Sequence, residues 1–144
     1  LHKELVLDRQ WVDWLSAGAD DHRDPGVFVV LARVKEEAHA DAVRAAIERT
    51  LALAGSTTLD AERLASVTSR LRYGFLSGLQ TPDQVAATVC HYAQLNGKAG
   101  TIDRSFATLH RVDAEDVSRA AARVFRPVNR TVVTLAPRVV KVPA

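Results

Sequence analysis

Residues 10–34 read QWVDWLSAGADDHRDPGVFVVLARV, and this stretch decides the fold class. Aromatic and branched side chains dominate Gln10–Ala19, which predicts a strand. The apolar run Val27–Val34 is rich in β-branched residues and predicts a second strand. The Asp-Pro-Gly sequence at 24–26 is typical of a turn. We therefore predict an antiparallel hairpin near the start of the chain.

Two tryptophans lie three residues apart in the first of these strands, at Trp11 and Trp14. Side chains alternate along a strand, so the two rings should face opposite sides. We expect one tryptophan in the core. The other is a candidate contact for a partner or for a further segment.

Helical patterns surround this hairpin in the sequence. Lys3–Asp8 is typical of the end of a helix, and helices are predicted after the hairpin. In order, these are Ala38–Ala54, Leu59–Leu79, the segment from Pro82 to Asn96, Ile102–His110, and a last helix that follows Asp113 and ends before Pro127. A final strand is predicted at Thr131–Leu135, and we expect it to pair with the early strands.

Apolar residues recur on one face of the three longer helices. In the first they are Val43, Ile47, Leu51 and Ala54; in the second Leu64, Val67, Leu71, Phe75 and Leu79; in the third Val85, Val89 and Tyr92. Gly55 is expected to stop the first of these helices.

Two of the predicted helices have recognisable start signals in the sequence. Thr81 and Gln84 are placed to form a capping box around Pro82. Asp113 is the expected cap of the last helix.

Two strands, a block of helices and a last strand indicate an α+β fold rather than α/β. Three strands make a thin sheet beneath so many helices. We therefore expect residues upstream of Leu1, in a longer protein, to supply further strands.

Composition excludes several classes of protein. The chain has 144 residues, 47% of them apolar, which suffices for one domain with a core. The net charge is +2 and basic residues are scattered among acids, so we expect no nucleic-acid partner. The longest apolar run is too short to span a membrane, and no secretory signal is visible. Cys90 is the only cysteine, so no disulfide forms within the chain; nothing selects a compartment.

A search for chemistry finds no catalytic, cofactor-binding or metal-binding residue. The five histidines are His2, His22, His39, His91 and His110, and none has a second histidine three to five residues away. Cys90 and His91 are adjacent on a predicted helix and diverge, so we interpret Cys90 as a small buried apolar residue. The acidic pairs at 20–21, 36–37 and 115–116 lie in turns or near helix starts, where acids favour solubility or the helix dipole.

Four segments together resemble the insulinase/pitrilysin family of zinc metallopeptidases, which includes the mitochondrial processing peptidase. They read KELVLDRQWVDWLSA, RDPGVFVVLARVK, SRLRYGFLSGLQTPDQVA and VDAEDVSRAAARVFRPVNRTVVTLAP, in the family's order. The resemblance covers residues 1–137 and is most specific at the last segment. It implies that 1–137 is the later part of a second, non-zinc peptidase domain, followed by a tail or linker at 138–144. It also implies an α+β fold with an antiparallel or mixed sheet, helices packed on one face, and the domain's first strand or strands and a helix lying upstream of Leu1.

The family's zinc motif, an inverted His-x-x-Glu-His, is absent here, so zinc is expected only in an upstream domain of the parent protein. A substrate-binding Arg and Tyr of the family, seven residues apart, align with Val6 and Asp13. Val6 donates no hydrogen bond, and Asp13 brings the wrong charge toward a carbonyl. This departure favours the domain beside the zinc-bearing one, or a member that has lost activity.

Three hypotheses follow. The first is a noncatalytic domain that helps to form the substrate chamber of a zinc peptidase, with a neighbouring peptidase domain and a peptide as its partners. The second is an inactive paralogue that serves as a structural subunit beside a partner subunit. The third is an unrelated α+β binding module. A His-x-x-Glu-His motif upstream separates the first from the second, and stable folding of a complete 144-residue protein favours the third.

Overall fold

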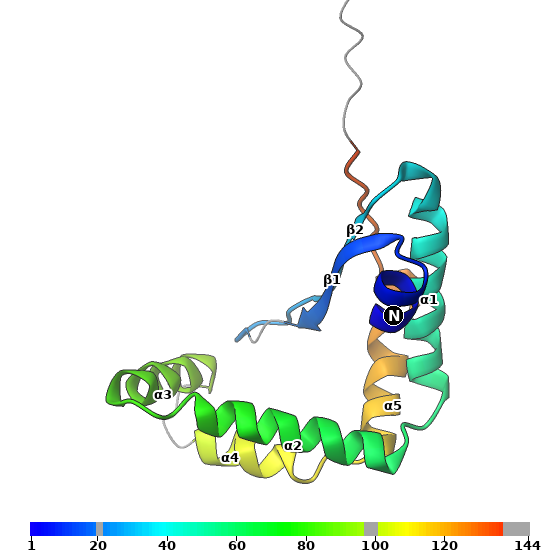
Figure 1. Ribbon diagram of the computed structural model, residues 1–144. Coiled ribbons are helices and arrows are strands. Elements are labelled where there is room, and N and C mark those ends of the chain that lie inside the picture. The colour runs from blue at the N-terminus through cyan, green and yellow to red at the C-terminus, as the bar shows by residue number, and fades with distance from the viewer. Residues whose placement is uncertain (20–21, 97–100, 137–144) are drawn as a thin grey trace, which may run out of the picture.

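The computed structural model describes residues 1–19, 22–96 and 101–136, and within them the chain is α+β (Figure 1). The elements follow one another as η1 (His2–Asp8), β1 (Val12–Ala19), β2 (Phe28–Val34), η2 (Glu37–His39), α1 (Ala40–Ser56), α2 (Ala61–Ser77), α3 (Pro82–Asn96), α4 (Thr101–Leu109), α5 (Ala114–Val124) and η3 (Pro127–Asn129). The predicted hairpin and the helices after it are confirmed, with ends that shift by one to three residues.

β1 and β2 form an antiparallel pair whose register runs from Val12 opposite Val34 to Ala19 opposite Phe28. An irregularity between Val12 and Trp14 shifts the register once near the start of β1. The π-helix η1 turns back onto this end of the hairpin, and the Trp11 backbone N–H donates to the Leu5 carbonyl over 3.0 Å. The first residues of the chain are thereby fixed to the sheet.

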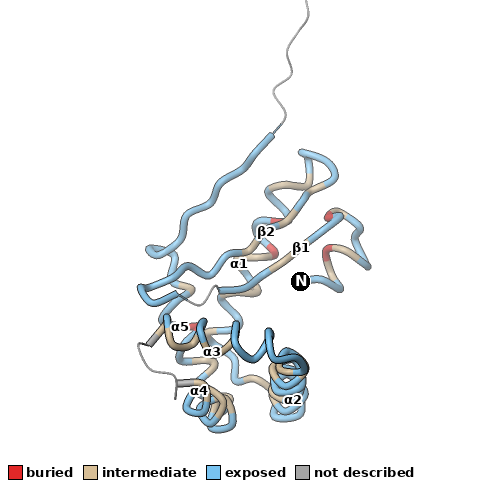
Figure 2. Tube along the Cα trace, turned by 90° about the vertical axis from the view of Figure 1, so that its left-hand side faces the viewer, coloured by how far each residue is buried: buried red, intermediate tan, exposed pale blue. Residues whose placement is uncertain are grey.

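The buried core lies where η1, the hairpin and α1 meet (Figure 2). Its fully or nearly fully buried members are Leu5, Val12, Val43 and Ala46. Partly buried side chains from the same elements pack around them, among them Trp11, Leu15, Ala32, Val34 and Ile47. Val43 and Ile47 of the predicted helix face are thus confirmed as core contacts, whereas Ala54 is exposed.

α1 and α5 pack side by side although three helices separate them in the sequence (Figure 1). The Ser118 hydroxyl of α5 donates to the Thr57 carbonyl just beyond α1 over 3.2 Å. Gly55 was expected to stop α1, and this was wrong, because the helix continues to Ser56. A Cβ atom on Gly55 would lie 3.0 Å from the Ala122 Cα atom, so glycine is needed here for close helix packing.

We call η1, the hairpin, α1 and α5 the hairpin unit, and α2, α3 and α4 the helical arm, which extends away from one end of α1 and α5 (Figure 1). Aromatic contacts hold the arm together: Phe75 lies 5.3 Å from Phe106 and 6.3 Å from Tyr92 between ring centroids. Among its described residues no side chain is fully buried.

The apolar faces predicted for the arm are only partly covered. Leu64, Phe75, Leu79, Val89 and Tyr92 are half-buried as expected. Val67, Leu71 and Val85 were also expected to face inward, and this was wrong, since 38%, 53% and 41% of their surfaces are exposed. The arm is a thin layer of helices, and no described element lies over these residues.

Both predicted helix starts are confirmed. The Gln84 backbone N–H donates to the Thr81 hydroxyl oxygen over 3.3 Å, and the Thr81 N–H donates to the Gln84 side-chain oxygen over 3.2 Å. At α5 the Asp113 carboxylate accepts from the Asp116 N–H, and the Asp116 carboxylate accepts from the Asp113 N–H. These reciprocal bonds satisfy backbone donors that a helix start leaves open.

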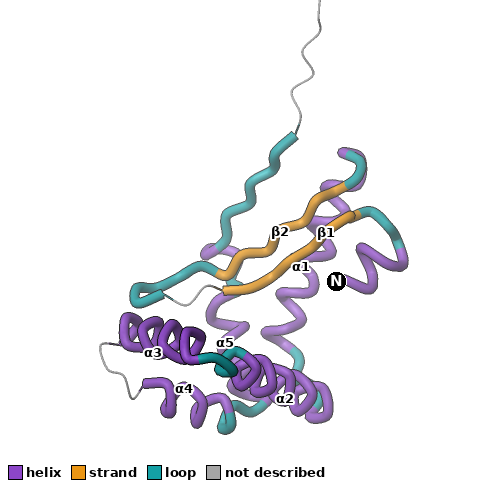
Figure 3. The backbone as a smooth tube through the Cα atoms, turned by 60° about the vertical axis from the view of Figure 1, so that its left-hand side comes forward, coloured by secondary structure: helices purple, strands orange, loops and turns teal. Residues whose placement is uncertain are grey.

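The predicted last strand is absent. Residues 130–136 form an irregular segment in place of a strand at Thr131–Leu135 (Figure 3). Within the described ranges the sheet contains β1 and β2 alone, and residues 130–136 form no ladder with either strand. Their apolar side chains are exposed accordingly, with Val132 at 46%, Val133 at 76% and Leu135 at 94%. The proposed tail at 138–144 lies outside the described residues.

Candidate functional site

The hairpin presents one covered and one open face. Leu15 and Ala32 pair across the strands and pack toward the core. Trp14 and Arg33 pair on the opposite face, where Trp14 is 50% exposed and Leu31 is 51% exposed. Together with Ala32 these residues line a shallow, open hollow. The hollow thus combines two exposed apolar side chains, Trp14 and Leu31, with the charged side chain of Arg33.

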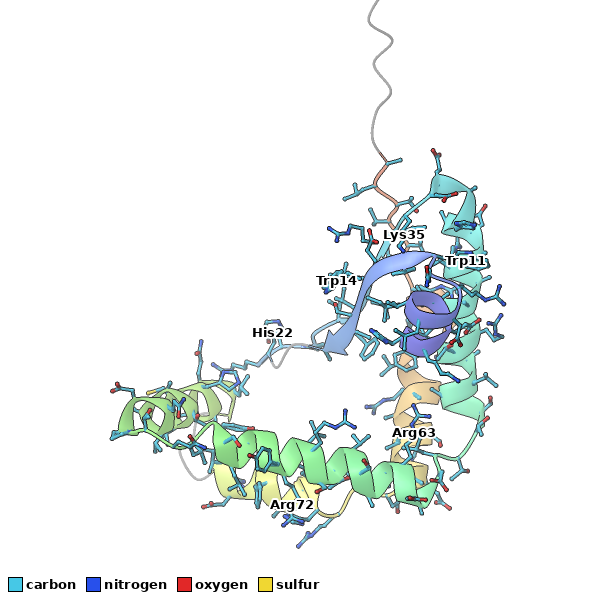
Figure 4. The ribbon with its side chains drawn as sticks, viewed as in Figure 1. Trp11, Trp14, His22, Lys35, Arg63 and Arg72 are labelled. Carbon is cyan, nitrogen blue, oxygen red and sulfur yellow. The ribbon has the colours of Figure 1, made fainter. Side chains whose placement is uncertain are left out.

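Trp11 is the tryptophan of the pair that packs against the core. Its ring stacks on His39, with 4.8 Å between centroids and planes 13° apart, and the Arg9 guanidinium carbon lies 4.5 Å from the centre of the Trp11 ring. The backbone N–H of Lys35 also donates to the Trp11 carbonyl. Trp11 therefore anchors η1 to the hairpin and α1, and the prediction of one core and one surface tryptophan is confirmed (Figure 4).

The two positions that align with the family's substrate-binding pair have other roles in this chain. Val6 is half-buried and packs against the core. The Asp13 carboxylate lies 3.5 Å from Nε of Arg33 and 3.9 Å from Nζ of Lys35. Neither side chain is placed to donate a hydrogen bond to a peptide carbonyl, because one is apolar and the other is an acceptor held by two cations.

Cys90 was interpreted as a small buried residue, and this was wrong, because it is exposed on α3. The neighbouring His91 packs edge-on against Tyr92, with 5.6 Å between ring centroids. Adjacent helical positions point apart, so the two side chains do not form a nucleophile and its base.

No group of three or more His, Cys, Asp and Glu residues that could hold a metal ion occurs among residues 1–19, 22–96 and 101–136. The described residues therefore offer no set of donors that fits zinc, and we derive no catalytic step through a metal in this chain. No described helix is long and apolar enough to cross a membrane.

The acidic pairs serve helix starts where they are described. Asp116 closes the capping box of α5, and its carboxylate lies 2.7 Å from a guanidinium nitrogen of Arg119. Glu36 and Glu37 lie at the start of η2. The pair at 20–21 lies outside the described residues.

One carboxylate stands out electrostatically, although it is not part of a pocket. A hydrogen bond from Arg44, 2.8 Å long, holds the pKa of Glu48 below its usual value, and the charge of Arg130 acts in the same direction. The same contact raises the pKa of Arg44. Glu48 thus joins α1 to the segment after α5 through Arg130, whose nitrogen lies 3.4 Å away.

A second surface comes from α2, whose arginines were not among the site residues predicted from the sequence. Arg63 lies on the side of α2 that faces the hairpin unit, and Arg72 lies on the opposite side (Figure 4). Helical spacing places Arg70 with Arg63, seven residues away, on the inner side. The signal that could have found this surface was the spacing of the arginines, read apart from the apolar stripe.

Comparison with known proteins gives a similarity of fold. No protein-family model matches the chain, and no curated protein matches it. A solved structure described as a protease from Helicobacter pylori is similar in fold, with a TM-score of 0.78 and 20% sequence identity. The similarity covers 88% of this chain but only 30% of the Helicobacter pylori protein. The chain therefore shares the fold of part of a longer protease.

Proposed function

We propose that this chain is a noncatalytic domain of a zinc-dependent peptidase and helps to form the chamber in which a peptide is cleaved. The observation that carries the proposal is the fold similarity to part of a protease, over 88% of this chain and 30% of the other. The finer part of the proposal, a relationship to the insulinase/pitrilysin family, rests on the sequence resemblance. Zinc, its ligands and the general base would belong to a domain outside this chain.

The open face of the hairpin is the proposed contact with the neighbouring peptidase domain or partner subunit. Trp14 and Leu31 expose apolar surface there, beside the charged head of Arg33. Tryptophan and arginine are enriched among the few residues that contribute most of the binding energy in protein interfaces. Burial of this face by a neighbour would also cover apolar side chains that the hairpin unit leaves in water.

The test uses the whole protein in which the chain occurs. Trp14→Glu and Leu31→Glu place a charge in the proposed contact, and we expect peptide cleavage to fall by about tenfold or more. Leu76→Glu is the matched control, because Leu76 is similarly exposed, at 56%, but lies on the helical arm. It should change cleavage by less than about twofold.

A direct result on the chain itself would contradict the proposal. Purified Leu1–Ala144 should neither bind zinc in a one-to-one ratio nor cleave peptides in a chelator-sensitive way. Either activity in this fragment would place the catalytic centre in this chain and overturn the noncatalytic assignment.

A second function is favoured by Val6 and Asp13. These residues replace the hydrogen-bonding pair implied by the resemblance, and Asp13 is held by Arg33 and Lys35. An inactive paralogue that acts as a structural subunit would tolerate this replacement. Sequencing of the transcript upstream of Leu1 separates the two functions: an inverted His-x-x-Glu-His motif supports the peptidase, and a continuous reading frame without it supports the subunit.

A further inference from the structure

A stripe of four residues runs along the inner side of α2. Arg63, Val67, Arg70 and Gly74 follow the spacing i, i+4, i+7 and i+11, which keeps them on one line of a helix. All four are exposed to solvent. We call this set the α2 stripe. It faces the hairpin unit, as the position of Arg63 shows (Figure 4).

The two guanidinium groups of the α2 stripe lack an acidic partner in the described part of the chain. Arg44 and Arg49 have carboxylates within 2.9 Å. Among the described residues, Arg72 and Arg104 are unpaired in the same way as the two arginines of the stripe. Arg63 uses only its backbone N–H, which donates to the Asp60 cap. Helix α2 is basic as a whole, since it carries three arginines and one acidic residue, Glu62. This surface therefore favours an anionic partner.

Gly74 is the second observation that indicates a partner at the α2 stripe. A glycine inside a helix is unfavourable relative to alanine, because it has more backbone freedom to lose. A Cβ atom at Gly74 would meet no atom of the described chain within 4 Å, in contrast to Gly55. No packing within the described residues explains glycine here. Close approach of another polypeptide backbone to α2 does explain it.

We propose that the α2 stripe binds an acidic stretch of the peptide substrate. Arg63 and Arg70 pair with substrate carboxylates, Val67 contacts aliphatic groups, and Gly74 lets the peptide backbone approach the helix. The arginines are separated by about 10 Å along the helix axis, which corresponds to about three residues of extended peptide. The inference rests on the proposed function and adds a preference for substrates with two nearby carboxylates.

Binding of labelled peptides to the purified 144-residue chain tests the inference. The probe is an unstructured, fluorescein-labelled Gly-Ser peptide with two Asp residues three positions apart, and its partner carries Asn at the same positions. Fluorescence anisotropy at low salt should give an affinity about tenfold higher for the Asp peptide, and the difference should shrink as salt screens the charges.

Arg72 provides a matched control on the same helix. The double variant Arg63→Gln with Arg70→Gln should bind the Asp peptide about tenfold more weakly, whereas Arg72→Gln, on the outer side, should change the Kd by less than about twofold. All three side chains are exposed, so the variants should keep the helical content of the wild-type chain. Circular dichroism checks this.

Gly74→Ala separates binding from stability. Alanine should raise the thermal unfolding midpoint, because it is the better helix former and has open space around it. It should nevertheless weaken binding of the Asp peptide several-fold, since its methyl group occupies the path of the peptide backbone. A purely structural role for Gly74 would change the unfolding midpoint and leave the Kd unchanged.

Equal affinity for the Asp and Asn peptides would overturn the inference. So would equal loss of binding in Arg72→Gln and in the Arg63→Gln, Arg70→Gln pair, because it would indicate a diffuse charge effect. Cleavage by the whole protein distinguishes these results from failure of the proposed function. Zinc-dependent cleavage without a preference for acidic peptides would support the chamber role and overturn only the proposed binding of acidic peptides by the α2 stripe.

Discussion

The hairpin unit and the helical arm differ in how they are held together. The hairpin unit contains all the fully buried side chains of the described residues, centred on Leu5 and Val43. The arm relies on half-buried aromatic contacts around Phe75 and leaves Val67, Leu71 and Leu76 exposed. The hairpin unit therefore supplies most of the stability, and the arm supplies mostly surface.

This difference assigns different roles to the two regions. A region with a buried core keeps its shape without help and can position others. A thin helical layer with open apolar and basic residues is suited to contact a partner, since its side chains have few intramolecular contacts to lose. Changes at the buried core of the hairpin unit should therefore alter stability, and changes in the α2 stripe should alter binding of the peptide.

The largest effect is expected at the centre of the core. Leu5→Ala removes a side chain that is 0% exposed, and we expect the free energy of unfolding to fall by about 2–5 kcal/mol. Urea denaturation followed by circular dichroism measures it. Leu76→Ala, in the arm, should cost less than about 0.5 kcal/mol, and equal losses in both variants would remove the distinction between the regions.

Gly55→Ala should have the next largest effect. The new methyl group would lie 3.0 Å from the Ala122 Cα atom and 3.1 Å from its nitrogen, and neither backbone atom can turn away. Helices α1 and α5 must separate, at a cost of about 1–3 kcal/mol. Thermal unfolding measures the loss, and an unchanged midpoint would show that the two helices pack less closely than described.

Gly74→Ala should change the free energy of unfolding in the opposite direction from Gly55→Ala. The same substitution in the arm meets no atom within 4 Å, so helix propensity alone acts on stability. We expect a gain of about 0.5–1 kcal/mol. The same denaturation experiment compares both glycines, and destabilisation at Gly74 would mean that α2 is covered in the isolated chain.

The smallest effect concerns pH. The hydrogen bond from Arg44 lowers the pKa of Glu48, so this pair stabilises the fold fully above the unfolded-state value, about 4.3. That stability is lost as the pH falls through the lower folded-state pKa. In Arg44→Gln the Glu48 pKa should move back up toward its usual value. NMR titration of the Glu48 carboxyl measures this, and an unmoved pKa would assign the shift to Arg130.

Sequence reasoning succeeded where the signal was local. Asp113 and Thr81 were predicted as caps from neighbours within four residues, and the hairpin followed from its own strands and turn. It failed where the answer depended on distant atoms. Gly55 was taken for a helix stop, but it is fixed by α5, about 67 residues away in the chain. Thr131–Leu135 has strand composition, but among the described residues it pairs with neither β1 nor β2.

The candidate surfaces show the same limit. Strand alternation predicted that one of the two tryptophans would be exposed, whereas the arginines of the α2 stripe were not predicted as a site. Whether charged side chains form a binding surface depends on which element they face. The position of α2 relative to the hairpin is set by tertiary packing, which the sequence alone does not reveal. The absence of a catalytic motif from the chain stays a prediction.

The hydrogen bond between Ser118 and Thr57 joins the two points where the chain leaves and re-enters the hairpin unit. Everything between them, including α2, α3 and α4, is an excursion whose ends are held together by α1 and α5. Closing a long loop costs entropy before the contact forms, so α1 and the hairpin should assemble early and α5 should dock late in folding. The excursion is also a natural place for evolution to lengthen, trim or exchange helices, because the surrounding core would not be rebuilt.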